Sequence, residues 1–176
     1  MSISLSAKKP TLLVCMGVSG CGKSTVAKAL AEHYDFKYYD ADDFHSERNK
    51  AHMAAGKPLT DAMRLPWVHT MREYFQLQAQ RGNSCTLAFS GLRAAHRKVL
   101  RDTDMQTVYV FLQGSKDVIA KRMSARTEHF MPLSLLDSQF ASLEDPRKEE
   151  DVLTIDIDQT LSGIIKDISG KIIFSH

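Results

Sequence analysis

The chain has 176 residues, of which 43% are hydrophobic and 25% charged, with 9 glycines and 5 prolines. This length suits one domain with a substantial core, and the composition excludes disordered, collagen-like and low-complexity chains. The 23 basic and 21 acidic residues leave a formal net charge of +2, too small to indicate a nucleic acid or an anionic membrane as partner. We therefore predict a single domain over residues 1–176, with no nucleic-acid or membrane partner.

The sequence carries no apolar run long enough to cross a membrane, and residues 1–10 lack the apolar stretch of a signal peptide. Its three cysteines, Cys15, Cys21 and Cys85, form no C-x-x-C pair, so neither a zinc site nor a disulfide framework is indicated. Unpaired cysteines are typical of a reducing compartment. We expect the protein to be cytoplasmic.

Apolar runs alternate with amphipathic segments along the whole chain. Strands are predicted at residues 11–16, 36–39, 84–89, 107–112 and 151–157. Helices are predicted at residues 23–34, 46–56, 60–81, 94–101, 115–126, from 134 and from 159, with Ser46, Thr60 or Asp61, Ser115 and Ser134 as expected N-caps. This alternation predicts an α/β fold, with a five-stranded parallel sheet covered by helices on both faces. Ligands of such sheets bind at the carboxyl ends of the strands.

Residues 17–24, Gly-Val-Ser-Gly-Cys-Gly-Lys-Ser, follow the first of these strands and open the first of these helices. They match G-x-x-x-x-G-K-[ST], the phosphate-binding P-loop, in every fixed position. Glycine lets backbone N–H groups approach phosphate oxygens, and the helix directs its positive end at the same anion. Lys23 is expected to reach the outer phosphates, and the Ser24 hydroxyl to ligate Mg²⁺. The predicted nucleotide-binding residues are Gly17, Val18, Ser19, Gly20, Cys21, Gly22, Lys23, Ser24 and Thr25.

A P-loop by itself does not say what the nucleotide is used for. The chain has no Asn-Lys-x-Asp guanine-binding motif on a late strand, which argues against a GTPase switch. A motor ATPase normally needs a longer chain and an acidic residue ending an apolar strand, whereas residues 84–89 lead into Ser90-Gly91. These exclusions leave a kinase for a small molecule or a nucleoside phosphate.

Asp40 and Asp42 lie two residues apart at the end of a predicted strand, so an extended chain would place both carboxylates on one face. In a kinase one such carboxylate steadies Mg²⁺, here assigned to Asp40. The other orients or deprotonates the attacking hydroxyl, here assigned to Asp42. A solvated acidic turn is the alternative for both residues.

Arg93 and Arg97 lie four residues apart after the third predicted strand, on one face of a predicted helix. Their guanidinium groups suit a carboxylate or a phosphate, with surface solvation as the alternative. For His96 between them, surface solvation is the preferred interpretation.

Arg122 and Arg126 repeat this spacing just before the irregular residues 127–132. An arginine at the base of a lid would neutralise charge on a transferring phosphoryl group. Arg126 is predicted in that catalytic role, and Arg122 is predicted to bind the nucleotide.

From about residue 12 to residue 157 the chain resembles the gluconate kinase (gluconokinase) family of shikimate-kinase-like P-loop kinases. Beyond the P-loop, the matching motifs are Asp40-x-Asp42-Asp43-Phe44-His45 with Asn49, Arg64-x-Pro66-Trp67, Ser90-x-Leu92-Arg93 with Arg97, and His129-Phe130-Met131-Pro132 before Leu135-Leu136-x-Ser138-Gln139-Phe140. Three places depart from the family pattern. Gly91 and Arg93 stand where the family has Ala and Lys, and Glu128 stands where it has Gly. Asp61-Ala62-Met63-Arg64 lacks the second acidic residue usual before the arginine.

The resemblance implies ATP-dependent phosphorylation of D-gluconate on its 6-hydroxyl, with Mg²⁺, in a homodimer. It implies a substrate-binding helical insertion at about residues 44–82 and a lid at about residues 126–133. The substrate-binding residues it suggests are Asp42, His45, Arg48, Arg64, Arg93 and Arg97. A kinase for another small acid or a nucleoside monophosphate, and a non-catalytic nucleotide-binding module, remain as alternatives.

Overall fold

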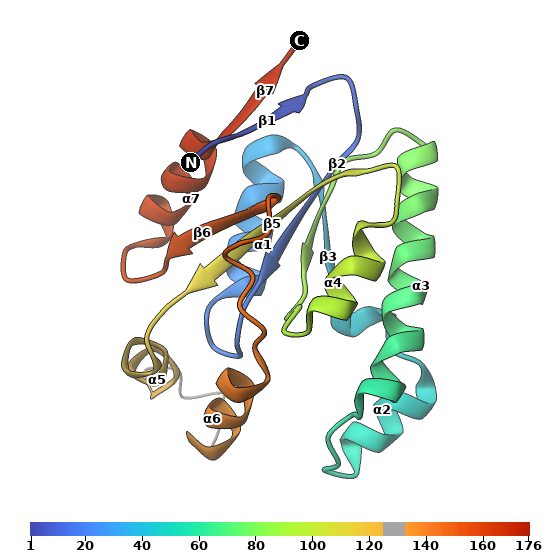
Figure 1. Ribbon diagram of the computed structural model, residues 1–176, viewed down its shortest axis with the longest axis vertical. Helices are drawn as coiled ribbons and strands as arrows, with labels where there is room; N and C mark the ends of the chain where they lie inside the picture. Colours follow the sequence, from blue (N-terminus) through green and yellow to red (C-terminus); the bar gives the residue numbers. More distant parts are fainter. Residues whose placement is uncertain (125–132) are drawn as a thin grey trace.

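The computed structural model describes residues 1–124 and 133–176. At its centre lies a sheet of five strands in the order β3-β4-β2-β5-β6, in which every neighbouring pair is parallel (Figure 1). The strands are β2 (Thr11–Met16), β3 (Lys37–Asp40), β4 (Cys85–Ala88), β5 (Gln106–Gln113) and β6 (Val152–Asp156). The predicted five-stranded parallel sheet is confirmed, and no strand end is shifted by more than one residue.

Helices connect these strands in the predicted order. They are α1 (Lys23–Tyr34), α2 (Glu47–Ala54), α3 (Asp61–Gln80), α4 (Ala94–Arg101), α5 (Lys116–Ser124), α6 (Leu133–Ser142) and α7 (Leu161–Lys171), with a 3₁₀ turn η1 (Ala41–Phe44) after β3. The side chains of Ser46 and Thr60 cap α2 and α3 by accepting the backbone N–H three residues on. The predicted cap at Ser134 is wrong, because α6 already begins at Leu133.

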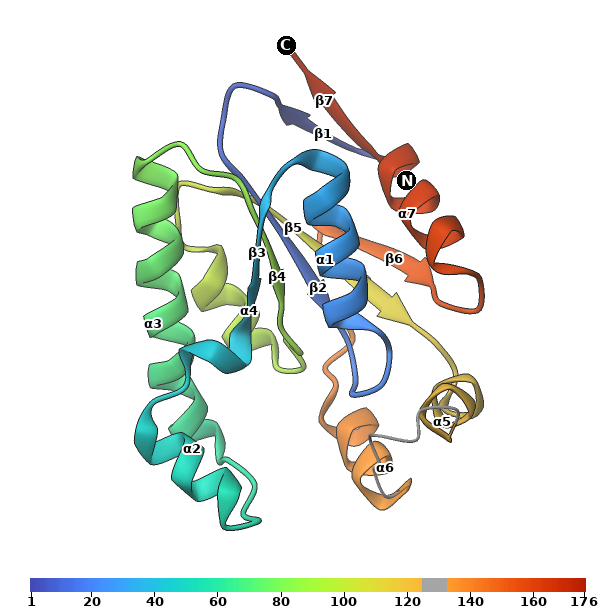
Figure 2. The ribbon, with the colours of Figure 1, turned by 180° about the vertical axis from the view of Figure 1, so that it is seen from behind.

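Helices cover both faces of the sheet because the strand residues alternate in direction. On one face Leu13 and Cys15 of β2 pack with apolar side chains of α1 and α7. On the other face Leu12, Val14 and Met16 join a second apolar cluster that includes residues of α3 and α4. Figure 2 shows α1 in front of the sheet, α7 at the right beside β6, and α3 and α4 at the left.

Two short strands were not predicted from the sequence. β1 (Ile3–Ser6) and β7 (Ile172–Ser175) form a separate two-stranded parallel sheet, in which Ile3 is opposite Ile172. Each strand has four residues and only one of them is buried, so neither gives a clear apolar pattern. Their pairing depends on the fold, which brings the two ends of the chain together.

The carboxyl ends of the five central strands meet at one edge of the sheet, drawn at the bottom in Figure 1. The loop before α1 lies at this edge, with α2 on one side of it and α5 and α6 on the other, whereas β1 and β7 lie at the opposite end. Among the described residues no helix is long and apolar enough to cross a membrane.

Candidate functional site

The P-loop connects β2 to α1 in the conformation that its glycines allow. Gly20 has a φ of +83°, and Gly22, the N-cap of α1, has a φ of +98°, both in the region that side chains disfavour. The side chains of Val18 and Cys21 are buried and anchor the loop to the core. Burial also raises the pKa of the Cys21 thiol, so this residue contributes its backbone to the site rather than a nucleophile.

Lys23 and Ser24, in the first turn of α1, already point their polar atoms into this region. Lys23 Nζ donates hydrogen bonds to the carbonyl oxygens of Gly17 and Val18, both at 3.2 Å, which holds the ammonium group over the loop. Ser24 Oγ donates to Asp40 Oδ2 at 3.3 Å. The Ser24 hydroxyl and the Asp40 carboxylate are therefore in contact at the start of the helix that carries the P-loop lysine, and the binding roles predicted for these residues stay predictions.

Asp42 reaches the site by a different route from the one predicted. The chain leaves β3 at Asp40 and enters η1, and the Asp42 N–H donates to Asp40 Oδ1 at 2.9 Å, so the two residues are not consecutive members of one strand face. The Asp42 side chain is 86% exposed. Although this side chain is open to solvent, nearby protein groups displace part of its hydration. That loss and the Asp40 carboxylate raise the pKa of Asp42, while His45 and Lys23 act in the opposite direction.

His45 is held beside Asp42 by neighbours on two other elements. Its ring stacks on Trp67 of α3 at a centroid distance of 4.1 Å, and its Nε2 lies 3.9 Å from Asp42 Oδ1. The Asn49 amide nitrogen lies 3.4 Å from His45 Nδ1, and it also donates to the Met63 carbonyl oxygen at 3.3 Å. Because an amide nitrogen is a donor only, Nδ1 is the acceptor, and the imidazole proton is on Nε2, toward Asp42.

A pocket of about 310 Å³ opens next to the P-loop, and we call it the arginine pocket. It is lined by Pro58, Asp61, Arg64, Trp67, Phe89, Ser90, Leu92, Arg93, His96, Leu135, Ser138, Gln139 and Ser142. Its wall is continuous with the P-loop, since the Gly17 N–H donates to the Ser90 carbonyl oxygen at 3.1 Å.

Two of the predicted substrate-binding arginines, Arg64 and Arg93, line this pocket. Asp61 pairs with both, at 3.6 Å from Arg64 and 3.8 Å from Arg93, and Glu144 lies 3.3 Å from Arg93. These carboxylates hold the guanidinium groups in place, yet each arginine side chain stays about 40% exposed, so donors remain available to an anion.

His96 also lines the arginine pocket, and its predicted surface solvation is wrong. The residue is only 6% exposed, because α4 turns this face toward α3 and the pocket. Burial lowers the pKa of His96, which keeps its imidazole neutral near pH 7.

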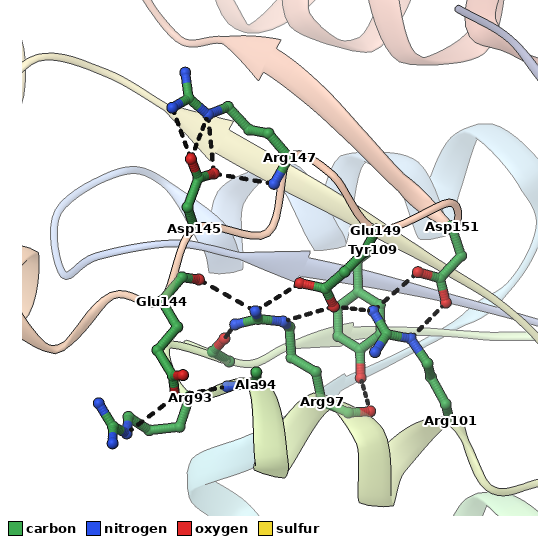
Figure 3. Close-up of polar contacts among 11 residues, drawn as sticks. Arg93, Ala94, Arg97, Arg101, Tyr109, Glu144, Asp145, Arg147, Glu149 and Asp151 are labelled. Carbon is green, nitrogen blue, oxygen red and sulfur yellow. Dashed lines mark hydrogen bonds and ion pairs between the residues drawn. The ribbon is translucent and has the colours of Figure 1, made fainter.

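Arg97 lies inside the protein, which corrects its prediction as a substrate ligand. Its side chain is fully buried, and each of its three guanidinium nitrogens is bonded to the protein (Figure 3). Nε and Nη2 donate to the Glu149 carboxylate at 3.1 and 2.7 Å, Nη1 donates to the Gly91 carbonyl oxygen at 2.6 Å, and Nη2 also donates to the Glu144 carbonyl oxygen. Arg97 therefore fixes the loop that carries Arg93, and Arg93 alone of this pair faces the pocket.

The network around Arg97 continues to the start of β6. Arg101 donates to both carboxylate oxygens of Asp151 and to Glu149, and the Tyr109 hydroxyl donates to the Arg97 carbonyl oxygen (Figure 3). Burial opposes ionisation of Glu149, but hydrogen bonds and charge from Arg97 and Arg101 together lower its pKa. The network joins α4 to the segment before β6.

The remaining predicted site residues lie around these two regions. Arg48 is exposed on α2 and lines a different groove of about 550 Å³ between α2 and α3, outside the arginine pocket. Arg122, near the end of α5, donates to the carbonyl oxygens of Ile157 and Gln159 after β6. Thr25 is exposed in the first turn of α1. Arg126, Glu128 and most of the predicted lid lie outside the described residues.

Comparison with known proteins agrees with this geometry. A family model described as an AAA domain matches residues 12–146. A gluconokinase of Gluconobacter oxydans is 40% identical over 147 residues, covering 84% of this chain and 83% of that protein. The thermoresistant gluconokinase of Escherichia coli is 38% identical over 156 residues, covering 88% and 89%.

The chain belongs to the gluconokinase family. A crystal structure of a gluconokinase from Sinorhizobium meliloti has the same fold, with a TM-score of 0.82 and 36% identity over 93% of this chain and 92% of that one. The family resemblance predicted from the motifs is confirmed.

Sequence reasoning missed three polar contributors to the site. Asn49, Trp67 and Gln139 were quoted only as parts of motifs, and none of them was assigned a role in the site. The spacing of Asn49 four residues after His45, within one expected helical turn, could have indicated their contact. For Gln139 no local signal exists, since its contact with the P-loop joins residues 120 apart.

Proposed function

We infer that this chain is a gluconokinase, which transfers the γ-phosphoryl group of ATP to the 6-hydroxyl of D-gluconate and gives 6-phosphogluconate and ADP. One observation carries this inference beyond family membership. A P-loop and a pocket lined by Arg64 and Arg93 share one wall at the same edge of the sheet. Phosphoryl donor and anionic acceptor would therefore meet there.

The acceptor side suits a small carboxylic acid. Arg64 and Arg93 offer guanidinium donors to a carboxylate, and Ser90, Ser138 and His96 offer polar atoms suited to hydroxyl groups. We propose that gluconate lies in the arginine pocket with its carboxylate on the arginines and its 6-hydroxyl toward the P-loop. Arg48 and Arg97 are left out of this assignment because of their positions.

Asp42 is the proposed general base. It takes the proton as the hydroxyl O–H bond breaks, the oxygen forms a bond to the γ-phosphorus, and the bond to the bridging oxygen breaks with its electrons leaving on ADP. His45, with its proton on Nε2, would keep the Asp42 carboxylate oriented. The raised pKa of Asp42 strengthens it as a base relative to an ordinary aspartate.

Lys23 and the P-loop N–H groups would bind the β- and γ-phosphates and stabilise charge that spreads during transfer. Arg122 is proposed to support ATP binding from α5. Arg126 is proposed to neutralise the transferring group, on the family resemblance and its position in the sequence.

The Ser24 hydroxyl and the Asp40 carboxylate fit a Mg²⁺ ion, because both are oxygen ligands and they lie 3.3 Å apart beside the P-loop. When bound, this ion would neutralise phosphate charge and align the donor. Tyr38 OH donates to the same Asp40 oxygen at 3.2 Å, which would orient the carboxylate toward it.

We also propose a cytoplasmic location and a homodimer. The first rests on three cysteines that are all free and buried, which suits a reducing compartment. The second rests on the family resemblance, and light scattering of the purified protein would test it.

The test of the function is ADP release in the presence of ATP and Mg²⁺ with gluconate, shikimate or a nucleoside monophosphate as acceptor. We expect strong stimulation by gluconate alone, with 6-phosphogluconate as product. Stimulation by one of the others would reassign the acceptor, and no stimulation by any of them would refute kinase activity toward this class.

A further inference from the structure

Gln139, half-buried on α6, contacts the P-loop through its side chain. Its Oε1 accepts a hydrogen bond from the Ser19 backbone N–H at 2.8 Å. A backbone N–H is a donor only, so the amide atom facing it must be the oxygen. The orientation of the amide group is therefore fixed, and its nitrogen, with two N–H donors, faces away from the Ser19 N–H.

The same side chain lines the arginine pocket, together with Arg64 and Arg93. Among the residues that the structure describes, Gln139 is the one side chain of this pocket that is hydrogen-bonded to the P-loop backbone. The amide nitrogen makes no hydrogen bond to another described residue. The acceptor atom of this amide is used by the P-loop, so its nitrogen is the atom left to donate to a ligand in the pocket that the side chain lines.

We propose that Gln139 binds the phosphoryl acceptor: its Nε2 donates a hydrogen bond to a hydroxyl oxygen of the sugar acid and so aligns the acceptor with the P-loop. This inference rests on the proposed function. A hydroxyl suits this position because it is an uncharged acceptor that matches the uncharged amide donor, whereas the charged carboxylate of the acceptor is assigned to the arginines. The bond to Ser19 fixes the donor before substrate arrives, which lowers the entropic cost of alignment.

Two substitutions separate this role from simple support of the P-loop. Gln139→Met has a similar length but neither donates nor accepts, and Gln139→Glu keeps an oxygen for the Ser19 N–H but offers no donor near pH 7. Gln76→Met is the matched control, because Gln76 is a glutamine of α3 whose amide bonds to Asp104 outside the pocket. Thermal unfolding of each variant reports whether α6 stays folded.

We expect both Gln139 variants to raise KM for gluconate about tenfold, the usual effect of one lost hydrogen bond of about 1.4 kcal/mol. The dissociation constant of a non-hydrolysable ATP analogue should stay within about threefold of wild type in the Gln139→Glu variant. Because methionine is uncharged, the same defect in both variants would exclude charge repulsion as its cause.

Three outcomes would overturn the proposal. The first is a gluconate KM within twofold of wild type in Gln139→Met. The second is a gluconate KM in Gln139→Glu that equals the wild-type value, because the acceptor oxygen that supports the P-loop would then be the only part of the amide that matters. The third is an equal loss of affinity for gluconate and the ATP analogue in both variants. Wild-type protein that does not phosphorylate gluconate would refute the proposed function instead, and the series would then be run with the acceptor that it does use.

Discussion

The P-loop and the arginine pocket share a wall, yet the chain builds them in different ways. The P-loop uses eight consecutive residues, and Gly20 and Gly22 give its backbone the conformation in which N–H groups are expected to face a phosphate. The pocket uses side chains from α3, the loop after β4, α4 and α6. A backbone site is therefore specified locally, whereas a side-chain site depends on how distant segments pack.

Arg93, at the end of the loop after β4, and Arg97, in α4, illustrate the difference. Arg93 and Arg97 have the same charge and were both predicted to bind substrate, but Arg93 faces the pocket and Arg97 is buried against Glu149. In the proposed function Arg93 donates hydrogen bonds to the ligand, whereas Arg97 holds the shape of the loop. Substitution of Arg93 should therefore change KM for gluconate, whereas substitution of Arg97 should change the free energy of unfolding.

The largest effect is expected for Arg97→Met, which leaves Glu149 with one arginine and the carbonyl oxygens of Gly91 and Glu144 without their donor. Breaking a buried ion pair on one side costs about 3–5 kcal/mol of unfolding free energy. Urea denaturation measures this loss of unfolding free energy as a lower midpoint. Arg147→Ala, in the exposed pair with Asp145, is the control and should leave the midpoint unchanged. An unchanged midpoint for Arg97→Met would show that the network does not support the fold.

Lys23→Ala should reduce kcat by about 10²–10³-fold, because a cation fixed over the P-loop stabilises charge on the transferring group. Steady-state kinetics at saturating gluconate measure this loss. Lys28→Ala, on an exposed part of the same helix, should leave kcat unchanged. Equal rates for the two variants would refute the assignment of the P-loop as the donor site.

Asp42→Asn should reduce kcat by about 10²-fold if the carboxylate is the general base. The base must be ionised, and the pKa of Asp42 is raised above 3.8, so wild-type kcat/KM should fall as pH decreases through a value above 3.8. The asparagine variant should lack that acid limb. Retention of the limb in the variant would assign it to another group.

The smallest effect is expected for Arg93→Leu, since Arg64 remains in the pocket. KM for gluconate should rise about tenfold, with KM for ATP and the urea midpoint little changed. Arg72→Leu, in a pair with Asp102 outside the pocket, is the matched control. A loss of stability without a change in KM would make Arg93 resemble Arg97 and remove the contrast between them.

Much of the fold follows from the sequence because its signals are local. The apolar run of β2, the glycines and lysine of the P-loop and the caps at Ser46 and Thr60 each act within a few residues. Periodicity cannot indicate a strand with a single buried residue, so β1 and β7 were missed. Nor does it show which face of α4 is covered, so His96 was placed on the surface.

The sequence by itself determined the parallel sheet, the P-loop, the edge of the sheet at which this loop lies and the family. Each rests on a contiguous motif or on a repeating apolar pattern, and these depend on local backbone geometry and burial. Only the tertiary structure decided that Asp42 enters through a 3₁₀ turn, that Arg97 is buried while Arg93 faces the pocket, and that Gln139 touches the P-loop. The physical reason is that a side chain's role depends on which distant groups satisfy its charge and hydrogen bonds, and packing alone brings those groups together.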